Sequence, residues 1–348
     1  MPQTRVNLTD VRTYFRPERV AQRIVDRESY GTPATDTFYP ERTRSNWDDV
    51  VVPVEEITRR TRAVPLVLRG APGVTVSGDG GGLSLIKPQP IKTIDGMTAA
   101  EYNNRRMFGR ESVDQLTGRI TDRHTDTHRK TREALCAQSL TGRIDFPIAG
   151  KTGQIIDVFS VKFGDTRAFV VAADWTAEAT TLGQIHKDLS NARTERSRAG
   201  YGTTDVYVGR DLFGALLDKV SAIGNDTRFS ARVRDDGAIQ IGSFVVMEMA
   251  EQYDHPGLPD FGQPGGAVVA GYKDVIGPTE VLMTDASQEW SLLNVRLDNF
   301  LLPPNPAPLG VIVDMARDGG QIDLYFESKP FPIPVAPAIT RFDATATA

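Results

Sequence analysis

The sequence predicts a mixed α+β fold, and three observations lead to this prediction. Residues 55–94 have the pattern of a long two-stranded hairpin, residues 170–250 mix helical and strand periodicity in one dense lobe, and residues 290–342 return to strands. The chain has 348 residues, of which 40% are apolar and 24% charged, so it can build a core of its own.

The hairpin at 55–94 has two β-rich arms and a glycine-rich tip at 78–82. The apolar residues that alternate along the arms are Val64, Leu66, Leu68, Leu83 and Leu85, and the prolines are Pro53, Pro65, Pro72, Pro88 and Pro90. Proline cannot donate to a strand ladder, so these arms are not central strands of a wide sheet. A two-stranded ribbon is marginal in water, so we expect a neighbouring subunit to bury it. The alternative is a long flexible loop or an active-site lid.

The first 50 residues contain few apolar positions and are predicted to be an arm that packs on something else. A short helix is expected from Pro17, because proline suits the first helical turn, and residues 37–40 are expected to be extended. A long polar helix is predicted over residues 98–138, starting with a capping-box pattern. A polar helix of this length is usually exposed on two sides or spans between lobes. The capping residues are Thr98 and Glu101, and the glycines expected to break the helix are Gly109 and Gly118.

The lobe and the C-terminal part alternate helical and strand patterns. In the lobe we expect a hairpin over 143–163, helices over 177–199 and 212–220, and a strand between them over 205–209. Strands over 229–233 and 238–249 follow, joined by a turn at Asp235-Asp236-Gly237, and then an irregular loop over 253–266. The C-terminal part is expected to contain two strands within 267–282, strands over 292–302, 309–315 and 321–327, and an extended proline-rich tail.

Composition excludes several classes of protein. There is no run of 18 apolar residues and no apolar leader, so we expect neither a membrane span nor export by a signal peptide. Cys136 is the single cysteine, which excludes an intrachain disulfide and a cysteine-based zinc site. The net charge of −5, from 40 basic and 45 acidic residues, argues against a dedicated nucleic-acid binder. It is compatible with a surface that lies near DNA without adhering to it.

Two glycine-containing fragments resemble nucleotide-binding motifs. Gly150-Lys151-Thr152 would need an earlier glycine at the position of Asp145 and a helix after it, whereas residues 154–158 read as a strand. The glycine run at 78–82 does not open a helix after a buried strand, so the dinucleotide-binding motif fails as well.

The histidines suggest two further chemistries. His124 and His128 share one face of the predicted helix, but a third ligand is missing, so we interpret them as part of a solvated polar helix rather than a metal site. Asp254 and His255 could belong to a Ser-His-Asp triad, but no Gly-x-Ser-x-Gly elbow supplies a nucleophile. Cys136 is interpreted as a small packed residue. We therefore predict no catalytic, cofactor-binding or metal-binding residue and no cofactor.

One region is rich in basic residues, with acidic residues interleaved. The basic residues are Arg105, Arg106, Arg110, Arg119, Arg123, Arg129, Lys130 and Arg132, and the acidic ones are Glu111, Asp114, Asp122 and Asp126. Salt bridges between subunits or simple solvation are favoured here over phosphate contacts.

Three strings carry a resemblance to a known family. They are Arg27-Glu28-Ser29-Tyr30 with the Thr-rich segment after it, Arg69-Gly70-Ala71-Pro72-Gly73-Val74 continuing to Ile86-Lys87-Pro88-Gln89-Pro90-Ile91-Lys92, and Glu327-Ser328-Lys329-Pro330-Phe331-Pro332-Ile333. Over essentially its full length the chain resembles the major capsid proteins of tailed phages, in the lambda-like capsid protein E family with the HK97-type fold. The resemblance implies an N-terminal arm (1–50), an extended hairpin loop (51–95), a peripheral domain with a long spine helix (96–168), an axial mixed α/β domain (169–288) and C-terminal strands that return to the peripheral domain (289–348).

The resemblance also implies a structural role without catalysis. Pentamers and hexamers would form the icosahedral head shell around phage double-stranded DNA, first as a procapsid that expands, with assembly in the host cytoplasm and a final place in the virion. The implied partners are further copies of the chain, a portal, a scaffold and non-specifically contacted DNA, with no membrane. Because the chain starts directly at the arm, we expect a separate scaffold protein.

Several points stay open at the level of sequence. Some relatives bind decoration proteins or form lysine–asparagine cross-links; the sequence leaves the first open and shows no motif that transfers the second. Two alternative functions are an encapsulin-like nanocompartment shell and a soluble metal- or nucleotide-dependent enzyme that uses His124 and His128 or Lys151.

Overall fold

The computed structural model describes residues 31–55, 83–98, 100, 113–150, 153–223, 231–262, 266–285, 287–288, 290–298, 308–315 and 321–345. The chain divides into two compact units. Unit 1 comprises Met1–Val52, Ile86–Cys136 and Ser291–Pro332, and unit 2 comprises Pro53–Leu85, Ala137–Trp290 and Ile333–Ala348. Each unit therefore combines stretches that are far apart in the sequence. The division into five parts stays a prediction.

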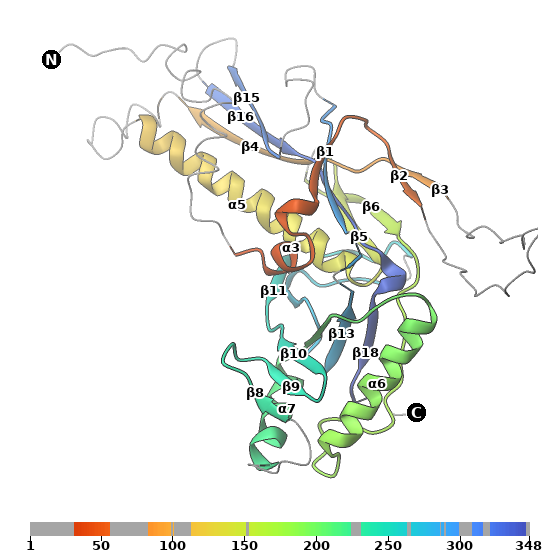
Figure 1. Cartoon of the computed structure of the whole chain (residues 1–348). Helices are drawn as coiled ribbons and strands as arrows, with labels where there is room; N and C mark the ends of the chain where they lie inside the picture. Colours follow the sequence, from red (N-terminus) through yellow and green to blue (C-terminus); the bar gives the residue numbers. More distant parts are fainter. Residues whose placement is uncertain are drawn as a thin grey trace, which may run out of the picture. The chain divides into compact units, whose positions relative to one another are not determined.

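Unit 1 contains a long helix beside a three-stranded antiparallel sheet. The sheet has the order β15 (Gly310–Met315), β16 (Gln321–Ser328), β4 (Ile91–Thr98). Helix α5 (Val113–Ser139) runs along it (Figure 1). The strand β16 is central and contributes Leu324 and Phe326, both completely buried.

A second sheet of unit 1 joins the segment after residue 31 to the C-terminal part of the chain. Its order is β1 (Arg44–Trp47), β14 (Ser291–Val295), β17 (Pro330–Ile333), and β1 and β14 are parallel. The short helix α3 (Pro33–Phe38) and the 3-10 turn η1 (Glu41–Thr43) precede β1.

Unit 2 is built on a six-stranded mixed sheet with two helices. The order is β18 (Thr340–Asp343), β13 (Glu280–Thr284), β7 (Asp205–Val208), β10 (Phe244–Glu248), β9 (Ile239–Ile241), β8 (Ala231–Val233), and only the β7–β10 pair is parallel. The helices are α6 (Leu182–Arg198) and α7 (Arg210–Ile223). Their apolar stripes, Leu182, Ile185 and Leu189 of α6 and Leu212, Leu216 and Val220 of α7, share one core with the sheet, as their spacing predicts.

Three two-stranded ribbons and one 3-10 turn complete the described chain. The ribbons are β2 (Val52–Glu55) with β3 (Leu83–Ile86), β5 (Arg143–Ala149) with β6 (Ile155–Lys162), and β11 (Gln252–His255) with β12 (Gly271–Asp274), and the turn is η2 (Ala336–Ala338). The β5–β6 hairpin confirms the prediction for residues 143–163. The β2–β3 pair forms the base of the predicted long hairpin, whose outer arms and tip lie outside the described residues.

The expectation of an extended chain at residues 37–40 is wrong, because α3 extends through Phe38. Pro33 stands in the first turn of this helix, where its fixed φ is favourable. The Thr32 hydroxyl donates to Asp36 Oδ2 at 2.8 Å and ties the turn from one end to the other. A helix of six residues is too short for apolar periodicity to show it.

The limits of the long helix also differ from the prediction. Thr98 is the last residue of β4, and α5 passes through Gly118 without a break. A single glycine costs a helix about 1 kcal/mol relative to alanine, which packing over 27 residues readily outweighs. Gly109 and the expected capping residue Glu101 lie outside the described residues.

Three predictions for elements of unit 2 are wrong. Helix α6 begins at 182 rather than 177, because Thr181 and Gln184 form a reciprocal capping box there. The strand expected over 238–249 is two strands, because Gly242 turns the chain at a φ of 59°. The expected strand at 267–270 is limited to a bridge between Leu258 and Val268, and the pairing strands are instead β11 and β12.

The predicted extended tail is only partly right. The chain is extended in β17 and β18, but between them Pro337 lies in the 3-10 turn η2.

Within the part of the chain that the structure describes, every helix is too short or too polar to cross a bilayer. The content of helices and separate sheets confirms the α+β class.

Candidate functional site

The face of α5 that lies on the sheet β15-β16-β4 carries two histidines. His124 and His128 are one helical turn apart, and both are buried, with exposed fractions of 7% and 5%. Thr121 and Thr125 are buried as well. The contact between α5 and the sheet is therefore largely polar.

Hydroxyl groups of the sheet hold both rings. Thr93 Oγ1 of β4 lies 2.7 Å from His124 Nδ1 and 3.1 Å from His128 Nε2. Ser328 Oγ of β16 lies 2.5 Å from His128 Nδ1. The His124 ring stacks on Phe326, with centroids 4.3 Å apart and planes inclined by 4°. We call this set of contacts between α5 and the sheet the histidine seam.

The seam keeps the imidazoles neutral. Desolvation by burial, followed by repulsion from His124, lowers the pKa of His128 from 6.5 to about 4. Desolvation also lowers the pKa of His124, although a hydrogen bond and the charge of Asp95 oppose this effect. Asp95 Oδ2 lies 3.4 Å from His124 Nε2 and also pairs with Arg123.

The structure overturns the interpretation of these histidines as solvated, because the sheet buries them. No group of three His, Cys, Asp or Glu side chains among the described residues is placed to hold a metal ion. The seam could have been found from the sequence, because Thr121, His124, Thr125 and His128 recur at helical spacing. The thin apolar stripe of this helix hid its buried face.

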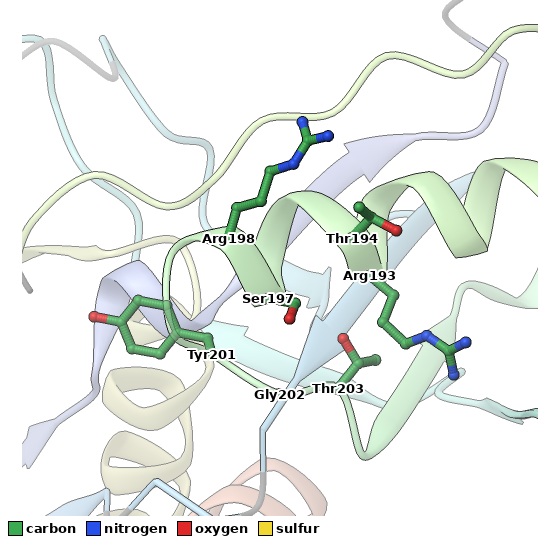
Figure 2. Close-up of a pocket in the computed structure, with 7 residues that line it drawn as sticks. All are labelled: Arg193, Thr194, Ser197, Arg198, Tyr201, Gly202 and Thr203. Carbon is green, nitrogen blue, oxygen red and sulfur yellow. The ribbon is translucent and has the colours of Figure 1, made fainter. Parts of the chain in front are cut away.

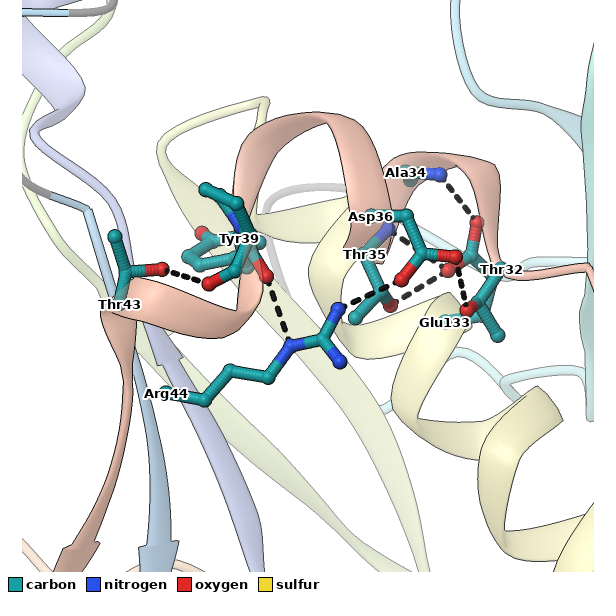
Figure 3. A network of polar contacts seen from close by, with 9 residues as sticks. Thr32, Ala34, Thr35, Asp36, Tyr39, Thr43, Arg44 and Glu133 are labelled. Atoms are coloured by element: carbon teal, nitrogen blue, oxygen red, sulfur yellow. Dashed lines mark hydrogen bonds and ion pairs between the residues drawn. The ribbon is translucent and has the colours of Figure 1, made fainter. Parts of the chain in front are cut away.

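Glu133, further along α5, forms a second buried polar contact. Its carboxylate accepts hydrogen bonds from Ala34 N at 2.6 Å, Thr35 N at 2.9 Å and Thr35 Oγ1 at 2.6 Å (Figure 3). Arg44 then ties the end of α3 to its start, since Nε donates to Tyr39 O at 2.9 Å and Nη2 to Asp36 Oδ1 at 2.7 Å. Desolvation raises the pKa of Glu133, and the three hydrogen bonds oppose the rise. Glu133 therefore anchors the segment before β1 on α5.

Unit 2 has an open pocket of about 460 Å³ at the C-terminal end of α6. It is lined by Arg193, Thr194, Ser197, Arg198, Tyr201, Gly202 and Thr203. Figure 2 shows the two arginines leaving the helix in different directions, with the hydroxyls of Ser197 and Thr203 between them. The pocket is thus basic and rich in hydroxyl groups.

The other candidates from the sequence do not form a catalytic arrangement in the described residues. His255 Nδ1 accepts from Gly257 N at 3.0 Å, and its ring meets the Phe146 ring edge-on, so it serves the turn after β11. Cys136 is completely buried, and burial raises the pKa of its thiol to about 12, in keeping with a packed residue. Gly150 closes the β5–β6 turn, while Lys151 and the glycine run at 78–82 lie outside the described residues.

The basic region near α5 is partly described. Arg105, Arg106 and Arg110 lie outside the described residues. Arg123 pairs with Asp95 of β4 within one copy of the chain. The expectation of salt bridges between subunits stays a prediction. Desolvation lowers the pKa of Arg132, which is largely covered. Where the structure describes this region, Arg123 is thus paired within the chain and Arg132 is largely covered.

Comparison with known proteins gives one match in sequence. Residues 18–342 match the family described as phage major capsid protein E. A search of curated proteins finds no match.

Several solved structures are similar to the chain at low sequence identity. The asymmetric unit of the bacteriophage PhiM1 mature capsid is 13% identical, covers 91% of this chain and 88% of that chain, and has a TM-score of 0.49. A phage-related protein from Bordetella bronchiseptica RB50 is 10% identical, covers 94% and 97%, and has a TM-score of 0.48. A virus-like particle from Pyrococcus furiosus is 12% identical, covers 95% and 99%, and has a TM-score of 0.43.

Proposed function

The chain belongs to the phage major capsid protein E family, and from this premise we propose that it assembles as pentamers and hexamers into the icosahedral head shell that encloses phage double-stranded DNA. Many copies of the chain form the capsid of the virion, and its role is structural. The family match over residues 18–342 carries this conclusion and confirms the predicted family. It favours a phage capsid over a cellular nanocompartment and over a soluble enzyme.

Exposed apolar side chains support assembly through other copies. They include Leu85 at the base of the long hairpin, Ile94 on β4 and Val269 in the loop before β12, with exposed fractions of 71%, 63% and 78%. Shell contacts of a standard size, about 800 Å² per partner, would remove such side chains from water.

We propose a separate scaffold protein, a portal and non-specific contact with packaged DNA, with assembly in the host cytoplasm. The resemblance to lambda-like capsid proteins supports these partners. The proposed role includes no catalysis. The occupation of His124 and His128 in packing contacts supports this part of the proposal.

The proposal is tested by expressing the chain with the scaffold protein encoded beside it and analysing the product by sedimentation and electron microscopy. We expect closed shells with the scaffold, and fewer or irregular particles without it. A chain that stays a single copy or a small oligomer under both conditions would overturn the proposal. Lys151→Ala, which tests the nucleotide-dependent alternative, is expected to leave the shells intact.

A further inference from the structure

Three cations lie on the exposed side of α6. Lys187, Arg193 and Arg198 are all exposed, and none of them pairs with a carboxylate among the described residues. Glu195 is the one exposed acidic residue of this helix. Three other exposed cations of unit 2 have acidic partners: Lys162 pairs with Asp165 at 2.7 Å, Arg210 with Asp211 at 3.3 Å and Arg234 with Asp236 at 3.1 Å. Exposed Arg232 instead donates to Gln240 Oε1 at 3.0 Å.

The positions of these residues place them along one face. Lys187, Asn191, Thr194 and Arg198 are separated by four, three and four residues, which aligns them in a stripe of about 16 Å along the helix. Arg193 and Ser197 lie beside this stripe. We define the basic face of α6 as Lys187, Asn191, Arg193, Thr194, Ser197 and Arg198.

Part of the basic face is held in place before any ligand binds. The guanidinium of Arg193 lies 4.7 Å from the centroid of the Phe244 ring and donates to Ser243 Oγ at 3.3 Å. Buried Arg196 donates to Gly202 O at 2.9 and 2.7 Å and to Met283 O at 2.9 Å, which fixes the loop below the pocket. In that loop, Thr203 Oγ1 is buried and without a hydrogen-bond partner among the described residues. Arg193 and the loop at 202–203 are therefore held by contacts within the chain.

The chemistry of the face distinguishes between two kinds of partner. All apolar side chains of α6 (Leu182, Ile185, Leu189 and Ala192) are buried in the core of unit 2. A protein interface needs an apolar centre, and the basic face offers none. Phosphate groups of nucleic acids are bound by arginine, lysine and the hydroxyl and amide side chains present here.

We propose that the basic face of α6 binds the phosphate backbone of double-stranded DNA and faces the interior of the shell. This inference rests on the proposed function and names the surface that contacts the packaged DNA. Duplex DNA carries about one negative charge per 1.7 Å of its axis, so a stripe of 16 Å meets several phosphates. These three cations, in a chain of net charge −5, give weak contacts that do not read sequence.

The experiment measures binding of the purified, unassembled chain to a short duplex of random sequence at several NaCl concentrations. The variant K187Q/R193Q/R198Q removes the three cations. The double variant K187Q/R198Q leaves the Phe244 contact of Arg193 in place, so its folding is the safer of the two. Each phosphate contact contributes about 1 to the slope of log K against log salt, so we expect the slope to fall by about 3 in the triple variant and about 2 in the double variant.

The matched control is K162Q/R210Q/R234Q, which removes three cations that already have acidic partners. It is expected to change the slope by less than about 1. Equal losses in the control and the triple variant, or no binding by the wild-type chain, would overturn the inference. So would a triple variant that binds DNA normally but no longer assembles with its scaffold, since the face would then bind protein. If the triple variant forms normal shells and binds DNA as the wild type does, this inference is wrong and the proposed shell function is unaffected.

Discussion

Both ring nitrogens of His128 form hydrogen bonds with hydroxyl groups, Nε2 with Thr93 and Nδ1 with Ser328. Among the described residues, no carboxylate forms a hydrogen bond or ion pair with this ring. Its pKa is 6.5 in an ordinary environment and about 4 in the folded chain, because burial disfavours the charged form. Between these two values the unfolded chain binds more protons than the folded chain. The stability that His128 contributes is therefore present above pH 6.5 and is lost as the pH falls through 4.

We predict that unit 1 loses up to about 3 kcal/mol of stability between pH 6.5 and 4 through this one histidine. His128→Gln keeps a hydrogen-bonding side chain without a titrating ring, so it should flatten the dependence on pH. Hydrogen exchange of the α5 amides, measured across this pH range on the unassembled chain, checks the prediction. His186→Gln, in unit 2, is the control and should leave the exchange of α5 unchanged. A His128→Gln chain that still loosens with acid as the wild type does would contradict the account.

Glu133 bears the contacts of α3 on α5, and its replacement leaves two backbone amides without an acceptor. We predict that Glu133→Ala costs about 3 kcal/mol and exposes residues 31–40 to proteases. Limited proteolysis with mass spectrometry measures this directly. Glu195→Ala, on the exposed side of α6, is the control and should not alter the cleavage pattern. Equal protection of residues 31–40 in the Glu133→Ala and wild-type chains would contradict the prediction.

At the level of elements, Gly209 links β7 to α7 where the chain passes close to the loop before β13. A Cβ at Gly209 would fall onto the carbonyl oxygens of Gly277 and Pro278. Pro278 O also accepts from Leu212 N at 3.0 Å, so it cannot move away without loosening the start of α7.

We predict that Gly209→Ala destabilises the chain by about 1–3 kcal/mol or more, because backbone atoms would have to shift. Gly214→Ala is the matched control: it lies within α7 and has open space at the Cβ position. Alanine there should stabilise the chain by about 0.5–1 kcal/mol. Urea denaturation of the two variants measures both changes. Equal free energies of unfolding for Gly209→Ala and Gly214→Ala would show that the close approach at Gly209 does not limit the side chain there.

The elements that the sequence predicts well are those whose burial is apolar. The stripes of α6 and α7 and the β5–β6 hairpin follow from periodicity and turn residues alone. The buried face of α5 was missed because histidine and threonine form it, and these residues are usually assigned to solvent. Helix α3 was missed because Glu133, 98 residues away from Thr35, completes its first turn.

The candidate site was harder to predict than the fold. A sequence pattern shows when a metal site lacks a ligand or a catalytic triad lacks a nucleophile. The missing third ligand argued in this way against a metal site at His124 and His128. A sequence pattern does not show which cations find partners. Lys162 and Lys187 look alike in the sequence, yet of these two only Lys162 pairs with an acidic side chain among the described residues.

At the scale of the whole molecule, the chain leaves apolar side chains in water that a shell would cover. Leu85 lies on β3 at the base of the long hairpin and is 71% exposed. Ser84, its neighbour on the same strand, is exposed as well. If the hairpin packs on a neighbouring copy, Leu85 contributes to assembly and little to the stability of a single copy.

We predict that Leu85→Ser changes the stability of the unassembled chain by less than about 0.5 kcal/mol. It should lower the yield of shells, because each copy loses about 1.5–3 kcal/mol of apolar burial in the assembly. Ser84→Ala is the control and should assemble normally. Denaturation of the single chain and sedimentation of the assembled product separate the two effects. Normal assembly of Leu85→Ser would show that this part of the hairpin is not an interface.

Cryo-electron microscopy of particles formed by the chain with its scaffold tests the central claim most directly. We predict a closed icosahedral shell of pentamers and hexamers in which residues 56–82 lie against a neighbouring copy. A compact single copy, with that segment folded back on its own chain under every assembly condition, would contradict the account.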